Sequence, residues 1–438
     1  MSVTERSMGL GLRALGRIAG SGLVDRLRAR RSAERIVYRA TRDGFRVASA
    51  SGRTFKAVRR RGQPARLKPA GTGGLFDLTP TDEQQMVKES FRAFAAEQLR
   101  PAANAADAAC AAPRELLEQL GELGLTTLGV PEELGGAVSE RSTVTSVLAA
   151  EALAHGDMGL AVAALAPATV ASALSLWGDG DQQATYLPAL VGDDVPPAAL
   201  ALHEPRPLFD PRALQTVARR DGGDYVLRGV KALVPLAAEA SLLIVGAQVE
   251  GRGLGLLVLE TSTSGVLVKP TPGMGVRAAA IGEVRFEDVR VPAGALLGGG
   301  DPDVYAECVR RARLAWCALS LGTSQAVLDY VIPYVNDRVA FGEPISHRQA
   351  VAFAISDIAI ELEGMRLATL RAASRADAGR DFAREVAVAR MLCAEKGARI
   401  GSEGVQLLGG HGYVTEHPVE RWYRDLQAVG VFEGALLV

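Results

Sequence analysis

Residues 225–236, YVLRGVKALVPL, open a series of short apolar runs in the middle of the chain. The series continues with ASLLIVGAQV (240–249), GLGLLVLE (253–260), GVLVKPT (265–271) and IGEVRFEDVRVP (281–292). The runs are rich in β-branched residues, and Gly, Asp and Ser separate them. This pattern is typical of strands joined by turns, so it predicts a β domain over residues 199–298.

Helical patterns flank this β domain on both sides. LTPTDEQQMVKESFRAFAAEQLRP (78–101) offers Thr81 as an N-cap, acidic residues in the first turn and apolar residues at helical spacing up to Pro101. We expect an N-terminal helical domain over 76–198 and a C-terminal helical domain over 299–438. Further helical runs cover 113–123, 138–156, 158–178, 180–191, 302–336, 346–377 and 382–409. The predicted fold is therefore a multi-domain α+β fold.

The composition is that of a globular protein with more than one domain. The chain has 438 residues, of which 48% are hydrophobic and 23% are charged. No uninterrupted apolar run is long enough to span a bilayer. Four cysteines are scattered without a C-x-x-C pair, which indicates buried thiols in a reducing compartment and no metal site: Cys110, Cys308, Cys317 and Cys393. We expect a cytoplasmic protein.

The first 75 residues differ in charge from the remainder. They hold 18 Lys/Arg against 4 Asp/Glu, although the whole chain has a net charge of -1. Three interpretations remain open: a loosely ordered solvated extension, a patch that contacts an anionic membrane or an acidic partner, and an organellar transit peptide. A role in nucleic-acid binding is not expected.

Six stretches, in register from residue 78 onward, carry a family resemblance. They are LGLTTLGVPEELGG (123–136), GDQQATYLPALVGDD (180–194), DYVLRGVK (224–231), NDRVAFGEPISHRQAVAF (336–353), QLLGGHGYVTEHPVERWYRD (406–425) and VFEG (431–434). Together they resemble the acyl-CoA dehydrogenase family. The resemblance implies an all-α N-terminal domain, a small central β-barrel and a C-terminal four-helix bundle. It also implies a dimer or tetramer that binds FAD and dehydrogenates an acyl thioester between its α and β carbons.

The same resemblance assigns roles to particular residues. Glu433 of VFEG matches the base that removes the α-proton, and Arg313 matches an arginine that supports this carboxylate beside the substrate. Some relatives carry the base next to that arginine, but here the position is Ala312. A third group matches residues that reach the FAD of a neighbouring subunit: Arg338, Phe341, Gln349, Gln406, Gly409 and Gly410.

Two loops depart from the family pattern where a subunit contacts its own flavin. HEPRPLFD (203–210) stands for T-E-P-G-x-G-S-D, so His203 and Phe209 replace a threonine and a serine. KALVPL (231–236) stands for K-x-W-I-T/S-N, so Leu233 and Pro235 replace an aromatic and a hydroxyl residue. Proline also lacks a backbone N–H donor. Two hypotheses follow: a divergent FAD-dependent dehydrogenase, or a flavin-poor partner subunit that completes the site of a homologous chain.

The substrate and the electron acceptor are less determined by the sequence. The acyl group would be carried by CoA or by an acyl carrier protein, and the electrons would pass to an electron-transfer flavoprotein or to oxygen. Acyl length would be set by residues between about 170 and 180 and by the first helix of the bundle. A related flavin monooxygenase or nitroalkane-oxidising enzyme is disfavoured, because the resemblance gives those enzymes no glutamate at the position of Glu433.

Overall fold

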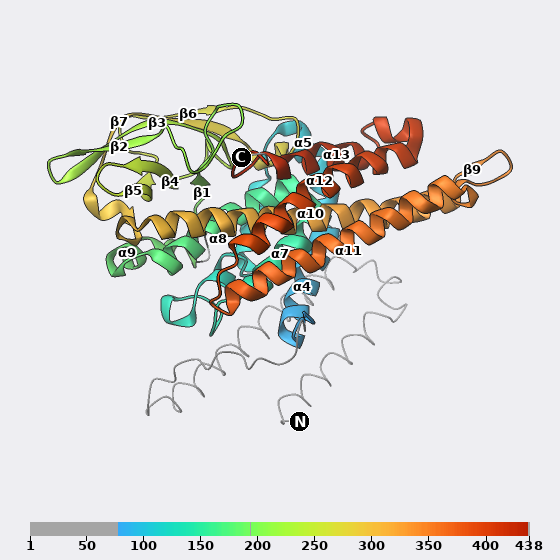
Figure 1. The fold of residues 1–438 in the computed structure, drawn as a ribbon, viewed down its shortest axis with the longest axis horizontal. Coiled ribbons are helices and arrows are strands. Elements are labelled where there is room, and N and C mark those ends of the chain that lie inside the picture. The colour runs from blue at the N-terminus through green and yellow to red at the C-terminus, as the bar shows by residue number, and fades with distance from the viewer. Residues whose placement is uncertain (1–77, 193, 437–438) are drawn as a thin grey trace, which may run out of the picture. The chain divides into compact units, whose positions relative to one another are not determined.

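The computed structural model describes residues 78–192 and 194–436 of the chain. These residues belong to one compact unit, drawn in colour in Figure 1. The expectations for the basic segment 1–75 lie outside the described residues. The order of elements is helices, then a sheet, then longer helices, as the sequence predicts.

The N-terminal part consists of helices that begin at Thr81. The side-chain hydroxyl of Thr81 accepts a hydrogen bond from the backbone of Gln84, and the Gln84 side chain accepts one from the backbone of Thr81. This capping box fixes the start of the first helix. The helices are α4 (Asp82–Phe94), α5 (Arg100–Ala109), α6 (Arg114–Glu122), α7 (Thr143–Gly156), α8 (Met158–Trp177) and α9 (Gly180–Leu190).

The predictions made around Pro101 and Cys110 are wrong. The first helical stretch does not end at Pro101, because a π-helical turn over Ala95–Leu99 leads into α5 and puts Pro101 in the first turn of a new segment. A proline there has no helical N–H bond to lose. Cys110 is not buried either, since it is the left-handed C-cap of α5 with φ +52°.

Helices α7 and α8 form the centre of the N-terminal part. Ser142 caps α7, which therefore begins at Thr143 and not near residue 138 as predicted. Helix α8 has 20 residues without a charged side chain, so the expectation that no apolar run is long enough to cross a bilayer was also wrong. Most of α8 is buried inside the protein, as in the core helix of a large globular fold.

The middle part is one eight-stranded sheet. Its strands follow the order β6-β7-β3-β2-β4-β5-β8, and β1 pairs in parallel with β4. A bulge between Leu227 and Gly229 and a register shift between Lys231 and Val234 bend β3 where it pairs with β7. The strands are β1 (Ala198–Ala201), β2 (Val217–Asp221), β3 (Asp224–Val234), β4 (Leu242–Val249), β5 (Gly253–Glu260), β6 (Val266–Pro270), β7 (Gly282–Val291) and β8 (Leu296–Leu297).

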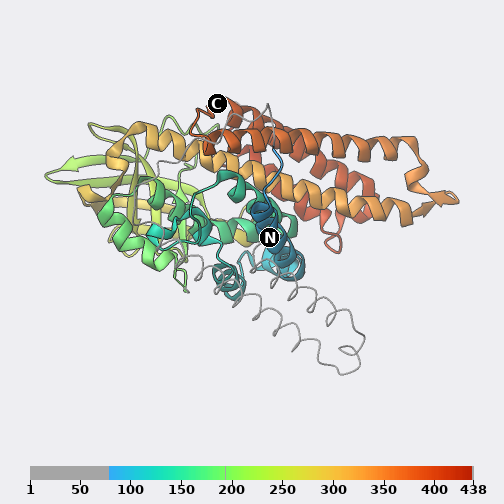
Figure 2. The same ribbon diagram turned by 90° about the horizontal axis from the view of Figure 1, so that it is seen from below.

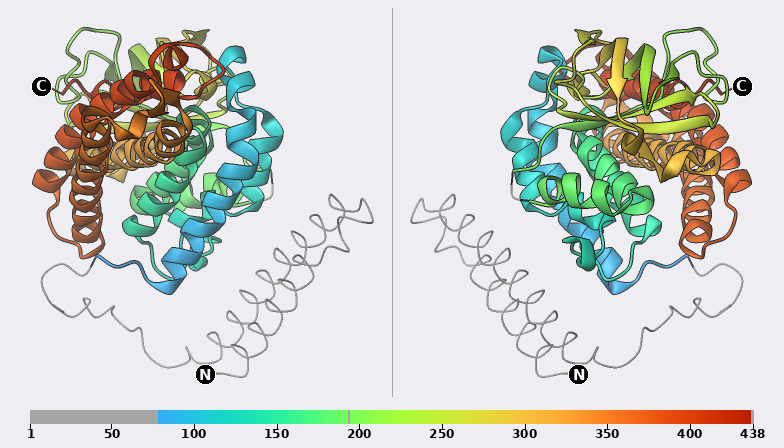
Figure 3. Two further views of the ribbon diagram at one scale, coloured as in Figure 1. Left: turned by 90° about the vertical axis from the view of Figure 1, so that its right-hand side faces the viewer. Right: turned by 90° about the vertical axis from the view of Figure 1, so that its left-hand side faces the viewer.

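The C-terminal part is a helical bundle that extends away from the sheet, as Figure 2 shows. Helix α10 runs beside α7 and joins the two helical parts, which Figure 3 shows next to each other in an end-on view. A short hairpin of β9 and β10 separates α10 from α11. The elements are α10 (Pro302–Asp337), β9 (Val339–Ala340), β10 (Glu343–Pro344), α11 (Gln349–Asp377), α12 (Ala383–Leu408) and α13 (Val419–Leu426).

A buried ion pair and a nearby buried hydrogen bond connect the three parts. Arg421 of α13 donates from Nε to Asp157 Oδ2 at 2.9 Å, and both side chains are almost completely buried. Asp157 also caps α8 through the backbone N–H of Leu160, and Asp425 accepts from the backbone N–H of Val276 in the β domain. Burial raises the pKa of both aspartates, so their hydrogen bonds are needed to keep them in place.

Candidate active site

A cavity of about 410 Å³ lies where α7, α8 and α10 meet β1 and the end of β3. Side chains between Ser172 and Trp177 of α8 and between Cys308 and Leu319 of α10 form much of its wall. The segment near 170–180 and the first bundle helix, which the resemblance implies to set acyl length, are therefore both part of this wall. Most lining side chains are apolar, so the cavity suits an extended acyl chain.

Glu433 lies in the wall of this cavity, close to the end of the chain. The residue is partly accessible, but its Oε2 is buried and has no hydrogen-bond partner. Burial raises the pKa of Glu433, against the opposing effects of the Arg390 charge, a hydrogen bond from Trp316 and the Arg313 charge. A buried carboxylate with a free oxygen and a raised pKa is equipped to accept a proton.

The backbone around Glu433 is held in a left-handed turn. Glu433 has φ +59° and Gly434 has φ +109°, which side chains other than glycine rarely adopt. Arg313 Nε donates to the carbonyl of Glu433 at 3.0 Å, and Arg390 Nη2 donates to the carbonyls of Phe432 and Gly434 at 2.5 Å each. The two arginines therefore hold the backbone on which Glu433 sits, and neither forms an ion pair with its carboxylate.

Arg390 and Trp316 were missed by the sequence analysis. Arg390 is buried in α12, on the same helix face as Val386, Cys393 and Gly397. A basic residue at a position where the helical spacing predicts an apolar one could have indicated its role from the sequence. Trp316 packs its ring 4.2 Å from that of Phe432, centre to centre. Nothing in its local pattern distinguishes it from an ordinary core residue of α10.

A buried ion pair joins the two loops that depart from the family pattern. Lys231 Nζ donates to Glu204 Oε1 at 3.0 Å, and the two carboxylate oxygens of Glu204 also accept from the backbone N–H groups of Gln215 and Thr216. Burial lowers the pKa of Lys231 to about 8, although Glu204 acts against this shift. Burial alone would raise the pKa of Glu204, but Lys231 and the two amides lower it overall.

His203 and Phe209 pack against each other in the first of these loops. Their rings lie 4.5 Å apart, centre to centre, and Phe209 is fully buried beneath the guanidinium of Arg206. His203 lines the cavity, and its buried Nδ1 has no hydrogen-bond partner. Burial, and then the charge of Lys231, lower the pKa of His203 to about 4, so the ring is neutral at neutral pH.

Leu233 and Pro235 of the second loop also line the cavity whose wall contains Glu433. Leu233 has φ +55° and Leu236 has φ +50°, so this loop holds two leucines in the left-handed region. The backbone N–H of Leu236 bonds to the carbonyl of Ala279. The loop therefore presents apolar side chains to the cavity on a constrained backbone.

Sequence comparisons agree with the arrangement of three domains. The acyl-CoA dehydrogenase N-terminal, middle and C-terminal domain families match residues 81–194, 199–289 and 303–436. The chain belongs to the acyl-CoA dehydrogenase family. It is 35% identical over 371 residues to the probable acyl-CoA dehydrogenase YngJ of Bacillus subtilis, covering 82% of this chain and 96% of that protein. Relatives of this kind are oxidoreductases that act on CH–CH bonds.

Two solved structures are similar to this acyl-CoA dehydrogenase family member along most of its length. One is butyryl-CoA dehydrogenase from Megasphaera elsdenii, with a TM-score of 0.77, 28% identity and coverage of 83% of this chain and 97% of that one. The other comes from work on the electron transferring flavoprotein of Acidaminococcus fermentans, with the same TM-score, identity and coverage.

The six residues that the resemblance assigned to a neighbour's FAD lie together at the far end of the bundle. This end, around the β9–β10 hairpin, lies away from the sheet in Figures 1 and 2. Tyr334 of α10 links the end of α12 to it through hydrogen bonds to the Leu408 carbonyl and to His411. None of these six residues lines the cavity that contains Glu433. The six are Arg338, Phe341, Gln349, Gln406, Gly409 and Gly410. All six are exposed to solvent.

Proposed function

We propose that this chain is an FAD-dependent acyl-thioester dehydrogenase in which Glu433 is the base that removes the α-proton. The single observation that carries the proposal is the buried, unpartnered Oε2 of Glu433 in the wall of a largely apolar cavity. A carboxylate in such a place costs stability, so a catalytic role is a sufficient reason for it.

Glu433 would act on the α-carbon of a thioester bound along the cavity. Its raised pKa brings it closer to the pKa of the α-proton, and the bonds from Arg313 and Arg390 hold the backbone from which the carboxylate extends. The base must be ionised, so activity is lost as the pH falls through this raised pKa. FAD, when bound, supplies the acceptor for the β-hydrogen, which leaves with its electron pair as the double bond forms.

Residues that line the same cavity as Glu433 fit a flat ring with polar edges. The Nδ1 of His203 is buried without a partner, so it could bond to a polar edge, while Leu233 and Pro235 offer an apolar surface next to it. The adenosine half of the cofactor would be reached by the exposed end of another subunit's bundle, which carries Arg338 and Phe341. This arrangement needs an oligomer, and we propose a dimer or tetramer.

The test is to purify the chain, record its visible spectrum and mix it anaerobically with acyl-CoAs of increasing length. Bound flavin should bleach as the acyl group is oxidised. Glu433→Gln should retain flavin and secondary structure but should lose bleaching, since the amide cannot take the proton. Glu97→Gln changes an exposed glutamate that does not line the cavity and serves as the matched control. Bleaching by Glu433→Gln at the wild-type rate would place the base elsewhere.

A second candidate function is a flavin-poor subunit that completes the site of a homologous chain. The observation that favours it is the closed form of the 203–210 loop, in which Phe209 is fully buried against His203, and Leu208 has φ +49° where the family has a glycine. A colourless isolated chain that restores flavin binding to a homologous subunit would support this function. A stoichiometrically yellow chain would exclude it.

The remaining partners follow from the dehydrogenase proposal. CoA or an acyl carrier protein would present the acyl group, and an electron-transfer flavoprotein or oxygen would take the electrons. We also propose a cytoplasmic location, with the basic segment 1–75 available for peripheral contact with an anionic membrane. Fractionation of cells that express the chain with and without residues 1–75 tests this point, because loss of membrane association on truncation is expected.

A further inference from the structure

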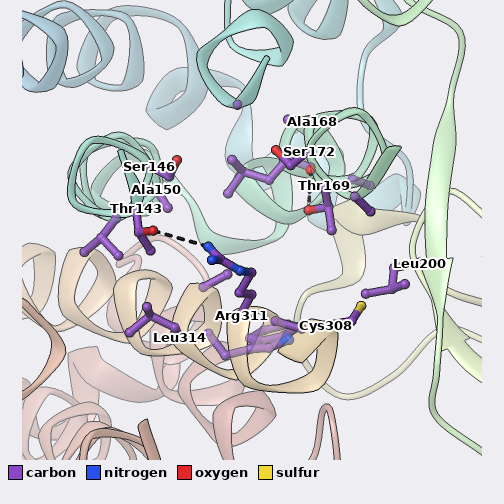
Figure 4. A pocket seen from close by; sticks show the side chains of 18 of the residues that line it. Thr143, Ser146, Ala150, Ala168, Thr169, Ser172, Leu200, Cys308, Arg311 and Leu314 are labelled. Atoms are coloured by element: carbon purple, nitrogen blue, oxygen red, sulfur yellow. Dashed lines mark hydrogen bonds between the residues drawn. The ribbon is translucent and has the colours of Figure 1, made fainter. Parts of the chain in front are cut away.

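The end of the cavity formed by the start of α7 and the last turns of α8 is polar, unlike the rest of its wall. Figure 4 shows the side chain of Arg311 rising from α10 into the space between α7 and α8, with hydroxyl groups on both sides. Thr143 and Ser146 come from the α7 side, and Thr169 and Ser172 come from the α8 side. The hydroxyls of Ser146 and Thr169 donate to backbone carbonyls of their own helices, whereas Thr143 accepts from Arg311 and keeps its own O–H for a ligand.

Arg311 at the polar end of the cavity and Arg313 behind Glu433 extend from different sides of helix α10. Residues two apart on an α-helix point about 200° apart, so Arg311 and Arg313 lie on nearly opposite sides of α10. Arg313 bonds to the carbonyl of Glu433, whereas Arg311 bonds to Thr143 of α7 at 3.3 Å. Small side chains at Ala312 and Ala315 line the cavity between them. An acyl chain that starts beside Glu433 therefore has a path toward Arg311.

The donors of Arg311 are only partly used by the protein. Its Nε and Nη2 donate to Glu307 Oε1 at 2.7 Å each, and Nη1 reaches Thr143. Phe382 packs against its guanidinium with 5.6 Å from Cζ to the ring centre. The remaining N–H of Nη1 and the second N–H of Nη2 have no protein acceptor among the described residues, which leaves two donors for a ligand.

Arg141 adds a second positive charge at the same end of the cavity. Its Nη1 donates to Ser175 at 3.2 Å, and no carboxylate of the described residues lies within ion-pair distance of it. Arg141 is exposed on part of its surface, and its partial burial, followed by the like charge of Arg311, lowers its pKa. Asp377 also lines this end, but its oxygens accept from the first backbone N–H groups of α7 and from Ser142. Glu307, which pairs with Arg311, offsets part of the repulsion between the two arginines, and an anion bound between them would reduce it further.

We propose that this polar end binds a carboxylate at the far end of the acyl chain, so that the substrate is the CoA monothioester of a dicarboxylic acid. The inference rests on the proposed dehydrogenase function and deepens it. Arg311 and Arg141 would pair with the terminal carboxylate, and Thr143 and Ser172 would supply hydroxyl donors. The apolar wall between would hold the methylene groups.

The test compares ω-carboxyacyl-CoAs with unsubstituted acyl-CoAs of equal chain length. The wild-type protein should show a higher kcat/KM for the ω-carboxylated series. Arg311→Met should lower that kcat/KM by about 10- to 100-fold, the loss expected for a hydrogen bond between charged groups, and should change the unsubstituted series by less than about twofold. Arg310→Met is the matched control, because Arg310 also packs on Phe382 but does not line the cavity.

A binding measurement tests the carboxylate site independently of the dehydrogenation reaction. Calorimetric titration with S-(ω-carboxyalkyl)-CoA and S-alkyl-CoA thioethers, which cannot be oxidised, should give tighter binding for the carboxylated ligand and loss of the difference in Arg311→Met. Equal losses for both ligands would mean that the arginines bind the phosphates of CoA, and would overturn the proposal. Activity on unsubstituted acyl-CoAs without any preference for the carboxylated series would also overturn it and leave the dehydrogenase function intact. If the chain oxidises neither series, the dehydrogenase function fails, while the titration still decides the site.

Discussion

Replacing His203 by glutamine should change how the stability of the protein depends on pH. The imidazole is largely buried, and its pKa falls from 6.5 in an unfolded chain to about 4 in the folded protein. A base with a lowered folded pKa binds protons more readily when unfolded, so wild-type stability is lost as the pH falls from 6.5 toward 4. The fall in pKa corresponds to about 3 kcal/mol in total.

The assay is urea unfolding, followed by tryptophan fluorescence, at several pH values between 8 and 4. The wild-type free energy of unfolding minus that of His203→Gln should be constant above pH 7 and should decrease by about 3 kcal/mol at pH 4. Leu208→Gln, at an exposed site of the same loop, adds no titrating group and should give a constant difference. A constant difference for His203→Gln would mean that the ring is open to water, and would refute the packing of His203 against Phe209.

Three further predictions concern stability. Gly322→Ala should lower the free energy of unfolding by about 1–3 kcal/mol or more, because the added Cβ would lie 2.1 Å from a backbone oxygen of α7. Gly364→Ala, where α11 leaves open space for the Cβ, should instead raise the free energy of unfolding by about 1 kcal/mol. Thermal or urea unfolding measures both changes. Arg421→Met should cost about 3–5 kcal/mol by leaving Asp157 buried without its partner, and adding Asp157→Asn should recover part of the loss. Glu433→Gln should have a higher melting temperature than the wild type at pH 7, because burial raises the pKa of the wild-type carboxylate and makes its ionised form costly. The difference in melting temperature should vanish below pH 4.5, where the wild-type carboxylate is protonated. A lower melting temperature for Glu433→Gln at pH 7 would contradict the burial of Glu433.

The sequence predicted the elements with strong local patterns and misplaced those decided by neighbours. The capping box at Thr81 and the long apolar periods of α10 to α12 are local signals, and those helices lie close to where they were expected. The first helical stretch continues past Pro101 because of a π-helical turn whose residues pack on α7. No local sequence pattern predicts this turn. The partial exposure of Cys110 has the same origin, since it follows from where α5 ends.

The sequence alone determined the order of domains, the family resemblance and the candidates Glu433 and Arg313, because each depends on residue type and spacing along the chain. The tertiary structure alone decided that Arg390, from another helix, holds the backbone on both sides of Glu433. It also decided that Arg311 enters a cavity between α7 and α8, although Arg310 next to it does not. These facts depend on which helix faces cross in space. Side chains far apart in the sequence meet there, and the distances that set pKa values and free donors exist only after packing.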